Sequence, residues 1–308
     1  MFYTIGDVHL GKRFKSKDIP LAKRGIREQI LTLRFQQAVT RAVKQVQKGG
    51  YEGIVFMGDL FDSFCVSYED IMTAYNVLRS IPITISTVIL EGNHDQSKNT
   101  DRVSAFQILE TLCKNVINLI FVSNKRDWYY TGNSLFVPYL GKGVSQIITK
   151  PVATADIYGH FEEEDFLWLK THFAHVYSGH IHSPRQEDNL TVVGSIMPFT
   201  FAEDPTNTFM KTCTLEEYEK DVRNGVAPYR CYRLKLKDGE VMPDSATAEC
   251  LQLSRYTGNN PAIEQEDLSV NFESFDLEKL MHEALDTLGV FQEFYDLYTK
   301  YRLEESNV

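Results

Sequence analysis

The sequence predicts an α/β fold, because apolar strand-like runs alternate with amphipathic helix-like segments over about its first 200 residues. Continuous apolar runs, the pattern of strands buried on both faces, occur at residues 2–5, 54–57, 87–90, 155–158 and 174–177. Apolar residues recur at helical spacing over residues 26–46, 68–79 and 104–113. A chain of 308 residues with 43% hydrophobic content can bury a substantial core. We therefore expect one large domain over residues 1–204, followed by smaller elements.

A polar segment that contains glycine follows each of the five predicted strands. These segments are Gly6-Asp7-Val8-His9, Gly58-Asp59-Leu60-Phe61-Asp62, Gly92-Asn93-His94-Asp95, Gly159-His160 and Gly179-His180-Ile181-His182. A glycine at the end of a strand lets the backbone turn sharply and approach a ligand closely. Open α/β sheets bind ligands at one rim, so we expect the five segments to converge there.

The side chains of these segments have the composition of a site for two divalent metal ions. Carboxylate and carboxamide oxygens together with imidazole nitrogens suit Mn²⁺, Fe or Mg²⁺. No cysteine joins the set, which disfavours a closed structural zinc site. Two ions about 3.5–4 Å apart can bind a phosphate between them and activate a water molecule. Taken alone, a Gly-Asn-His-Asp segment is a turn and His160 is a buried structural histidine, but the ordered set favours the metal site.

The five segments, in this order, resemble the sequence pattern of the calcineurin-like metallophosphoesterases. The metal ligands that the resemblance implies are Asp7, His9 and His182 for one ion, Asn93, His160 and His180 for the other, and Asp59 as the bridge. It also implies that His94 is the general acid and that Asp62 orients the His94 imidazole. The fold it implies is a four-layer αββα sandwich, in which two facing sheets are flanked by helices.

The flanking sequence favours DNA as the substrate. Residues 192–204 are similar to the corresponding stretch of SbcD-type DNA nucleases, especially their short bacteriophage members. Ser63 and Asp95 stand where protein phosphatases of the superfamily carry arginine and glutamate. The resemblance implies a Mn²⁺-dependent DNA exonuclease or endonuclease that works by a two-metal mechanism. It further implies a recombination and repair complex with an SbcC-type ATPase and a homodimer formed through the catalytic domain.

Charge is distributed unevenly along the chain. The net charge of −10 and the pI near 5.3 argue against a general nucleic-acid coat. Residues 11–27, however, contain seven basic residues and one acidic residue, and they begin two residues after His9. We expect this loop to hold the phosphate backbone of DNA, the alternative being a solvated loop that leads into a helix. The predicted DNA-binding residues are Lys12, Arg13, Lys15 and Lys17.

Three smaller elements are expected after residue 204. Residues 205–250 contain strand-like runs at 209–214 and 229–237 and predict a small α+β cap. Residues 251–275 are polar and predict a linker. Residues 276–308 predict two apolar-striped helices within an acidic segment. In the SbcD-type family such an element binds the ATPase, whereas the alternative is packing on the chain's own domain.

The remaining sequence features favour a cytoplasmic protein, in the host cytoplasm if a phage encodes it. The five cysteines are scattered and odd in number, as is typical of a reducing compartment. We find no signal peptide and no apolar run near the ~20 residues of a membrane helix. Two other functions are compatible with the sequence: a phosphoesterase acting on small nucleotides or phosphoprotein, and a non-catalytic scaffold that kept the fold.

Overall fold

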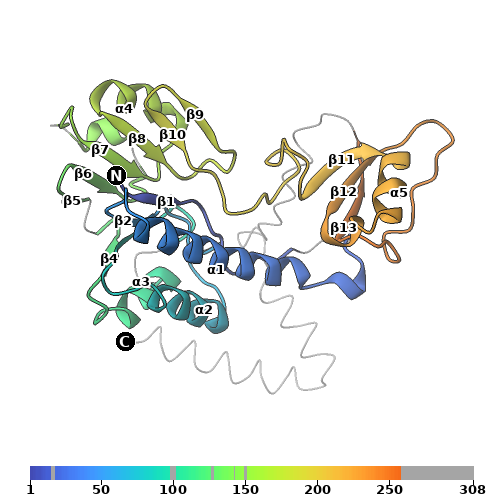
Figure 1. Ribbon diagram of the computed structural model, residues 1–308, viewed down its shortest axis with the longest axis horizontal. Helices are drawn as coiled ribbons and strands as arrows, with labels where there is room; N and C mark the ends of the chain where they lie inside the picture. Colours follow the sequence, from blue (N-terminus) through green and yellow to red (C-terminus); the bar gives the residue numbers. More distant parts are fainter. Residues whose placement is uncertain (15–17, 98–101, 126–127, 142, 149–150, 258–308) are drawn as a thin grey trace, which may run out of the picture. The chain divides into compact units, whose positions relative to one another are not determined.

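The computed structural model describes residues 1–14, 18–97, 102–125, 128–141, 143–148 and 151–257 (Figure 1). Its first sheet is parallel and has the strand order β1-β2-β3-β4. Its strands are β1 (Tyr3–Ile5), β2 (Gly53–Phe56), β3 (Ser86–Leu90) and β4 (Leu119–Val122). The helices that connect them are α1 (Ile26–Gln47), α2 (Tyr68–Arg79) and α3 (Ala105–Leu112). The strands β1, β2 and β3 and all three helices match the predicted segments to within a residue at each end, and α2 matches at both ends, whereas β4 was not predicted.

The second sheet has the order β5-β6-β7-β8-β10-β9, with a parallel centre and antiparallel edges. Its strands are β5 (Tyr129–Thr131), β6 (Ser134–Val137), β7 (Asp156–Gly159), β8 (His175–Ser178), β9 (Arg185–Glu187) and β10 (Leu190–Val192). Helix α4 (Phe166–His172) joins β7 to β8. The mixed α/β fold with parallel sheets is therefore confirmed.

Short 3₁₀ turns also occur along the described chain. They are η1 (Leu21–Lys23), η2 (Val144–Gln146), η3 (Glu163–Asp165) and η4 (Ala227–Tyr229).

Buried apolar clusters hold these elements together. Helix α1 buries Leu31, Phe35, Val39 and Ala42, the stripe expected from a 3.6-residue period. A separate cluster joins side chains of the two sheets, among them Phe2, Val55, Met57, Val88, Leu90, Val122, Phe136 and Tyr158. This packing fixes the strands of the two sheets against each other and so fixes the segments that leave their carboxyl ends.

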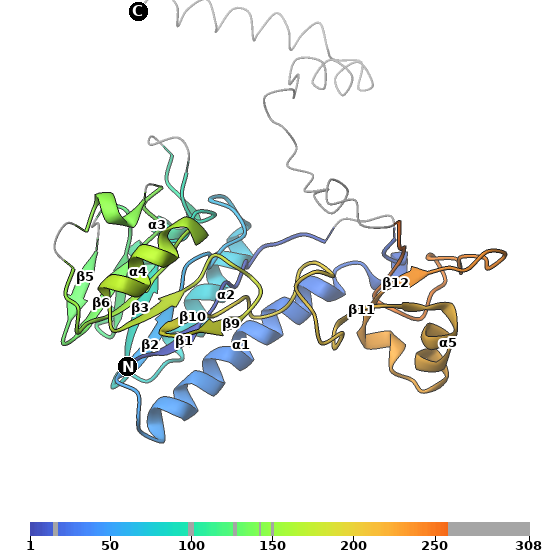
Figure 2. The ribbon, with the colours of Figure 1, turned by 90° about the horizontal axis from the view of Figure 1, so that it is seen from above.

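A third sheet, with order β11-β12-β13, follows the two sheets in sequence. It consists of β11 (Met210–Thr214), β12 (Cys231–Lys235) and β13 (Gln252–Arg255), which are all parallel. Helix α5 (Leu215–Arg223) connects β11 to β12 and lies beside them in both views (Figures 1 and 2). A Thr214–Glu217 capping box begins this helix.

The predicted linker begins too early at residue 251. Residues 252–255 form β13, which pairs along its length with β12. Leu251 and Leu253 are buried, and the Leu253 N–H donates to the carbonyl of Asp18. Alternating polar residues concealed this short strand in the sequence. The rest of the predicted linker beyond residue 257, and the predicted helical element at 276–308, lie outside the described residues.

Among the residues that the structure describes, no helix combines the length and apolar character needed to cross a bilayer. All five cysteines are free thiols, and only Cys65 is exposed.

Candidate metal centre

The five polar segments leave the carboxyl ends of β1, β2, β3, β7 and β8. Three of the predicted ligands in them have left-handed backbone conformations, with φ of 52° at His9, 45° at Asp59 and 72° at His180. Non-glycine residues adopt this region at an energetic cost, and such residues cluster at functional sites. The backbone is therefore bent so that side chains from separate strands point toward one place.

Two glycines are required for this close approach. Gly58 has φ +106°, and a Cβ there would lie 2.3 Å from His160 Nδ1. A Cβ on Gly92 would lie 2.1 Å from Asp59 Oδ1. Both distances are far below van der Waals contact, so no other residue fits without displacing a predicted ligand.

One group of donor atoms consists of Asp7, His9 and His182. The Nε2 atoms of His9 and His182 lie 3.0 Å apart, and His182 Nε2 lies 3.9 Å from Asp7 Oδ2. Asp7 and His9 are buried, and Asp7 Oδ2 has no hydrogen-bond partner among the described residues. A buried carboxylate oxygen without a partner is costly, and a bound cation would satisfy it.

A second group consists of Asn93, His160 and His180. Asn93 Oδ1 lies 2.8 Å from His160 Nε2 and 3.2 Å from His180 Nδ1, and these two nitrogens are 3.1 Å apart. His160 Nδ1 lies 2.9 Å from the carbonyl of Met57, so this ring nitrogen carries the hydrogen. The lone pair of Nε2 is consequently available to a metal ion.

Asp59 lies between the two groups. Its Oδ2 is 3.6 Å from His9 Nε2 and 3.4 Å from His160 Nε2. Three sets of side chains bring one donor atom per residue within 4.8 Å of one another: Asp7–His9–His182, Asp59–His160–His180, and a set at the exposed edge, His9–Asp59–His94. The oxygen and nitrogen donors, without any thiolate, fit two divalent ions, with Asp59 in the position of a shared ligand. Such a pair would bind a phosphate and activate a water molecule for attack.

The charges of the cluster shift its pKa values in opposite directions. Burial raises the pKa of Asp7 to about 7, against the opposing charge of His160. Burial would lower the pKa of His160, but the carboxylates of Asp59 and Asp7 outweigh it and raise this pKa to about 9. Burial would raise the pKa of Asp59, but the neighbouring histidines hold it below its usual range. Without metal, the His160 ring is therefore protonated on both nitrogens, and so positively charged, at neutral pH.

We expect Mn²⁺ binding to release protons, because a metal ion and a proton compete for the same lone pairs. The pKa of about 9 for His160 is above the ordinary 6.5, so the metal-free form keeps this proton until the pH rises through about 9. The apparent Mn²⁺ affinity should accordingly rise with pH up to that value. Titration calorimetry in buffers of different ionisation enthalpy, at about pH 7.5, measures the protons released. An identical heat in every buffer would contradict this expectation.

His94 lies at the exposed edge of the site, with its ring centroid 4.8 Å from that of His9. Its backbone N–H donates to Asp59 Oδ1 (2.9 Å), and its Nδ1 lies 2.7 Å from the carbonyl of Asp62. A carbonyl only accepts, so Nδ1 carries a hydrogen and Nε2 is left to face a substrate. This geometry suits the predicted proton donor.

Asp62, expected to orient the His94 imidazole, contacts that ring through its backbone and not through its carboxylate. Its carboxylate lies 3.2 Å from His9 Nδ1 and 3.0 Å from Lys12 Nζ, and only its backbone carbonyl contacts His94. Burial would raise the pKa of Asp62, but His9 and Lys12 hold it below the usual value. Asp62 therefore lies against His9 and Lys12 through its carboxylate and against His94 through its backbone carbonyl.

Asp95 has a structural role that the sequence did not reveal. It is fully buried and accepts hydrogen bonds from the N–H groups of Leu60 (3.2 Å), Phe61 (2.8 Å) and Gly92 (2.9 Å). One carboxylate thereby ties the segment after β2 to the segment after β3. In the sequence, only the position of Asp95 in the Gly-Asn-His-Asp segment pointed to this residue. Its three hydrogen-bond partners are brought to it by the tertiary fold.

Asp95→Ala should destabilise the fold by about 3 kcal/mol or more, because it leaves three buried N–H groups unpaired. Urea denaturation followed by circular dichroism measures the free energy of unfolding. Asp238→Ala is the matched control, since Asp238 is exposed, and it should change that energy by less than about 0.5 kcal/mol. Equal stability of the two variants would contradict the bracing role of Asp95.

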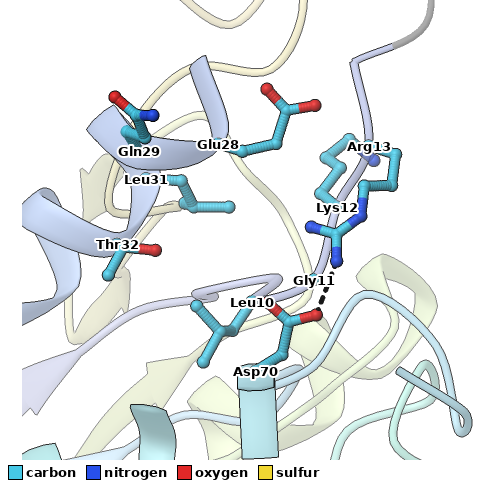
Figure 3. A pocket seen from close by; sticks show the side chains of 9 residues that line it. All are labelled: Leu10, Gly11, Lys12, Arg13, Glu28, Gln29, Leu31, Thr32 and Asp70. Atoms are coloured by element: carbon cyan, nitrogen blue, oxygen red, sulfur yellow. Dashed lines mark hydrogen bonds and ion pairs between the residues drawn. The ribbon is translucent and has the colours of Figure 1, made fainter. Parts of the chain in front are cut away.

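The predicted DNA-binding loop is only partly described. Lys12 lies between Asp62 and the Phe199 ring, with its Nζ 5.3 Å from the ring centroid. Arg13 pairs with Asp70 at 2.8 Å, and both line a cavity of about 140 Å³ beside α1 (Figure 3). Lys15 and Lys17 lie outside the described residues.

Arg27 is one of the seven basic residues of segment 11–27, but it does not contribute to an exposed DNA-binding surface. Its side chain is buried, with the guanidinium 3.8 Å from the centre of the Phe14 ring. It donates to Gln252 Oε1 (2.7 Å) and to the carbonyl of Phe199 (3.3 Å). Arg27 therefore connects α1 to β13 and to the loop beside the predicted metal ligands.

Two further carboxylates that the sequence did not single out contact predicted ligands. Glu162 Oε2 lies 3.0 Å from His180 Nε2, and Glu203 Oε1 lies 3.2 Å from His182 Nδ1. Glu203 falls within the segment compared with SbcD-type nucleases, but no role followed from that likeness. Glu162 begins a run of four acidic residues, 162–165, and nothing in the sequence distinguishes it from the other three.

The family model of the calcineurin-like phosphoesterases matches residues 2–193. This match covers more than half of the chain and all five polar segments, so the chain belongs to the calcineurin-like phosphoesterase family. The family and the clustered donor atoms together indicate a metal-dependent phosphoester hydrolase. No curated protein sequence matches the chain.

Proposed function

We propose that the protein is a Mn²⁺-dependent DNA nuclease, acting as an exonuclease or endonuclease within a recombination or repair complex. The observation that carries this proposal is the segment at residues 192–204, whose sequence is similar to SbcD-type nucleases. In the structure this segment contacts the metal centre, since the Phe199 ring lies 5.1 Å from His9 and 5.3 Å from His182 between centroids. The nuclease-like sequence and the candidate metal centre thus form one site.

The residue after Asp62 supports a substrate other than phosphoprotein. Protein phosphatases of the superfamily carry an arginine at this place, whereas Ser63 stands here. The Ser63 hydroxyl donates to the carbonyl of Cys65 at 2.6 Å and is engaged in the local turn. No guanidinium is supplied from this position to a phosphate.

In the proposed reaction, the seven predicted ligands would hold two divalent ions, which would supply positive charge to the phosphodiester and a nucleophile derived from water. His94, protonated on both ring nitrogens and held through Nδ1 by the Asp62 carbonyl, donates the Nε2 proton to the leaving sugar oxygen as its bond to phosphorus breaks. Asp62 fixes His9 in orientation, and Lys12 adds positive charge beside that pair. Phe199, packed on His9 and His182, excludes water from this side of the site.

The assembly is part of the same proposal. We infer that the catalytic domain is a four-layer αββα sandwich, which the apolar cluster shared by both sheets supports. The acidic, apolar-striped segment at residues 276–308 is proposed to bind an SbcC-type ATPase, and the catalytic domain to form a homodimer. These partners follow from the resemblance and from the sequence of the segment.

Release of nucleotides from a linear DNA duplex by the purified chain in Mn²⁺ tests the function. Bis-p-nitrophenyl phosphate, a small phosphodiester, is assayed in parallel under the same salt. Cleavage of both substrates is expected. Hydrolysis of the small diester without any cleavage of DNA, alone or with an ATPase partner, would contradict the nuclease proposal.

One observation favours a small-nucleotide phosphoesterase as the second candidate. Lys12 and Arg13 are both paired with carboxylates, Asp62 and Asp70, which reduces the positive charge they offer to a DNA backbone. This candidate predicts that a double substitution of Lys12 and Arg13 by glutamine leaves the rate unchanged on every substrate. The nuclease proposal predicts slower cleavage of DNA and a weaker dependence on salt.

A further inference from the structure

Besides the His9–Asp62 pair, each predicted ion has a histidine ligand whose second nitrogen contacts a carboxylate outside the ligand set. On one side, His182 Nδ1 lies 3.2 Å from Glu203 Oε1. On the other, His180 Nε2 lies 3.0 Å from Glu162 Oε2. In each ring the opposite nitrogen faces the metal centre, toward His9 for His182 and toward His160 for His180.

An aromatic ring accompanies each of these carboxylates. The Phe199 ring packs edge-on against His182, with centroids 5.3 Å apart, and the Phe199 N–H donates to Glu203 Oε2 at 2.7 Å. The Tyr139 ring stacks on His180 at 6.1 Å, and its hydroxyl donates to Glu162 Oε1 at 3.1 Å. Each histidine is thus restrained by two neighbours: an aromatic ring, and a carboxylate at the nitrogen that faces away from the metal centre.

From this arrangement we infer that Glu203 and Glu162 are positioning residues, each governing the affinity of a different ion of the pair. The inference rests on the proposed metal centre. A carboxylate that accepts a hydrogen bond from a ligand histidine fixes its tautomer, orients its ring and raises the basicity of the ligating nitrogen. Glu203 acts through His182 on the ion beside Asp7 and His9. Glu162 acts through His180 on the ion beside Asn93 and His160.

The two positioning residues differ in burial and in their other partners. The Glu203 side chain is 14% exposed and also accepts from the Thr200 hydroxyl at 3.1 Å, besides the Phe199 N–H. The Glu162 side chain is 45% exposed, and its other contact is the Tyr139 hydroxyl. Water competes more strongly for Glu162, so its removal should affect metal binding less than removal of Glu203.

Manganese affinity and site occupancy in Ala and Gln variants test the inference. Titration calorimetry gives the affinities, and anomalous diffraction from crystals soaked at limiting Mn²⁺ shows which ion is lost. Glu203→Ala should weaken the ion beside His182 by about 10–100-fold and leave the other ion in place. Glu162→Ala should weaken only the ion beside His180, by a smaller factor. Glu203→Gln should restore part of the affinity, because its amide oxygen still accepts from His182.

Glu163→Ala is the matched control, since Glu163 adjoins Glu162 in sequence but pairs with Arg185. It should bind both ions as the unaltered chain does. Unchanged affinity in both Glu203→Ala and Glu162→Ala, or equal loss of both ions in each, would overturn the positioning roles while the two-ion centre stands. If the unaltered chain bound no Mn²⁺ at all, the metal centre itself would be overturned.

Discussion

Asp59→Asn should lower the rate of phosphodiester hydrolysis by about 10³-fold or more, since several kcal/mol of charge stabilisation depend on the paired ions. The His94 N–H donates to Asp59 Oδ1, so an asparagine would keep its oxygen there. Its amide nitrogen would then occupy the place of Oδ2, between His9 Nε2 and His160 Nε2. An NH₂ group cannot bind a cation, and the shared ligand would be lost.

The hydrolysis rate of bis-p-nitrophenyl phosphate and the manganese content of the purified variant measure this effect together. Asp238→Asn is the control, because Asp238 is an exposed carboxylate. A variant at Asp59 that kept two ions per chain and nearly full activity would contradict the bridging position.

His94→Ala should lower kcat on DNA by about 10²–10⁴-fold, the usual contribution of a general acid, while both ions remain bound. His94 is exposed, and its ring nitrogen Nδ1 is engaged with the Asp62 carbonyl instead of a metal position. The loss should be smaller on bis-p-nitrophenyl phosphate, because p-nitrophenolate leaves without needing a proton. Steady-state rates on the two substrates give this comparison.

His175→Ala is the matched control for His94→Ala. His175 is also exposed and lies at the start of β8, where it pairs with Asp156 at 2.8 Å. Its replacement should leave kcat and the metal content unchanged. Loss of manganese in His94→Ala, or an equal loss of rate on both substrates, would show that His94 is not the proton donor.

Hydrophobic periodicity predicted the long elements because their signal is strong. Helix α2 occupies the predicted residues, and β2, β3, β7 and β8 coincide with the apolar runs to within a residue. Helix α4, with seven residues, is too short to show a helical period, and α5 is so polar that its main signal is the capping box at Thr214 and Glu217. Strand β13 was missed because polar residues alternate with its buried ones.

The residue types of the candidate site were predictable, but their contacts were not. The sequence alone shows glycine, carboxylate and histidine residues at the ends of the apolar runs, and the fold brings these segments together. Which neighbour a side chain contacts depends on the tertiary fold: the Asp62 carboxylate lies against His9, with only its carbonyl against His94. Glu203 and Glu162 could not be found from spacing, since each lies about 20 residues from the histidine it contacts.

Anomalous diffraction at the manganese edge, from a crystal of the unaltered chain soaked in Mn²⁺, tests most directly whether the five polar segments hold two ions. We expect two peaks about 3.5–4 Å apart. One peak should lie against Asp7, His9 and His182, the other against Asn93, His160 and His180, with Asp59 between them. A single peak, or peaks away from these residues, would contradict the two-ion centre.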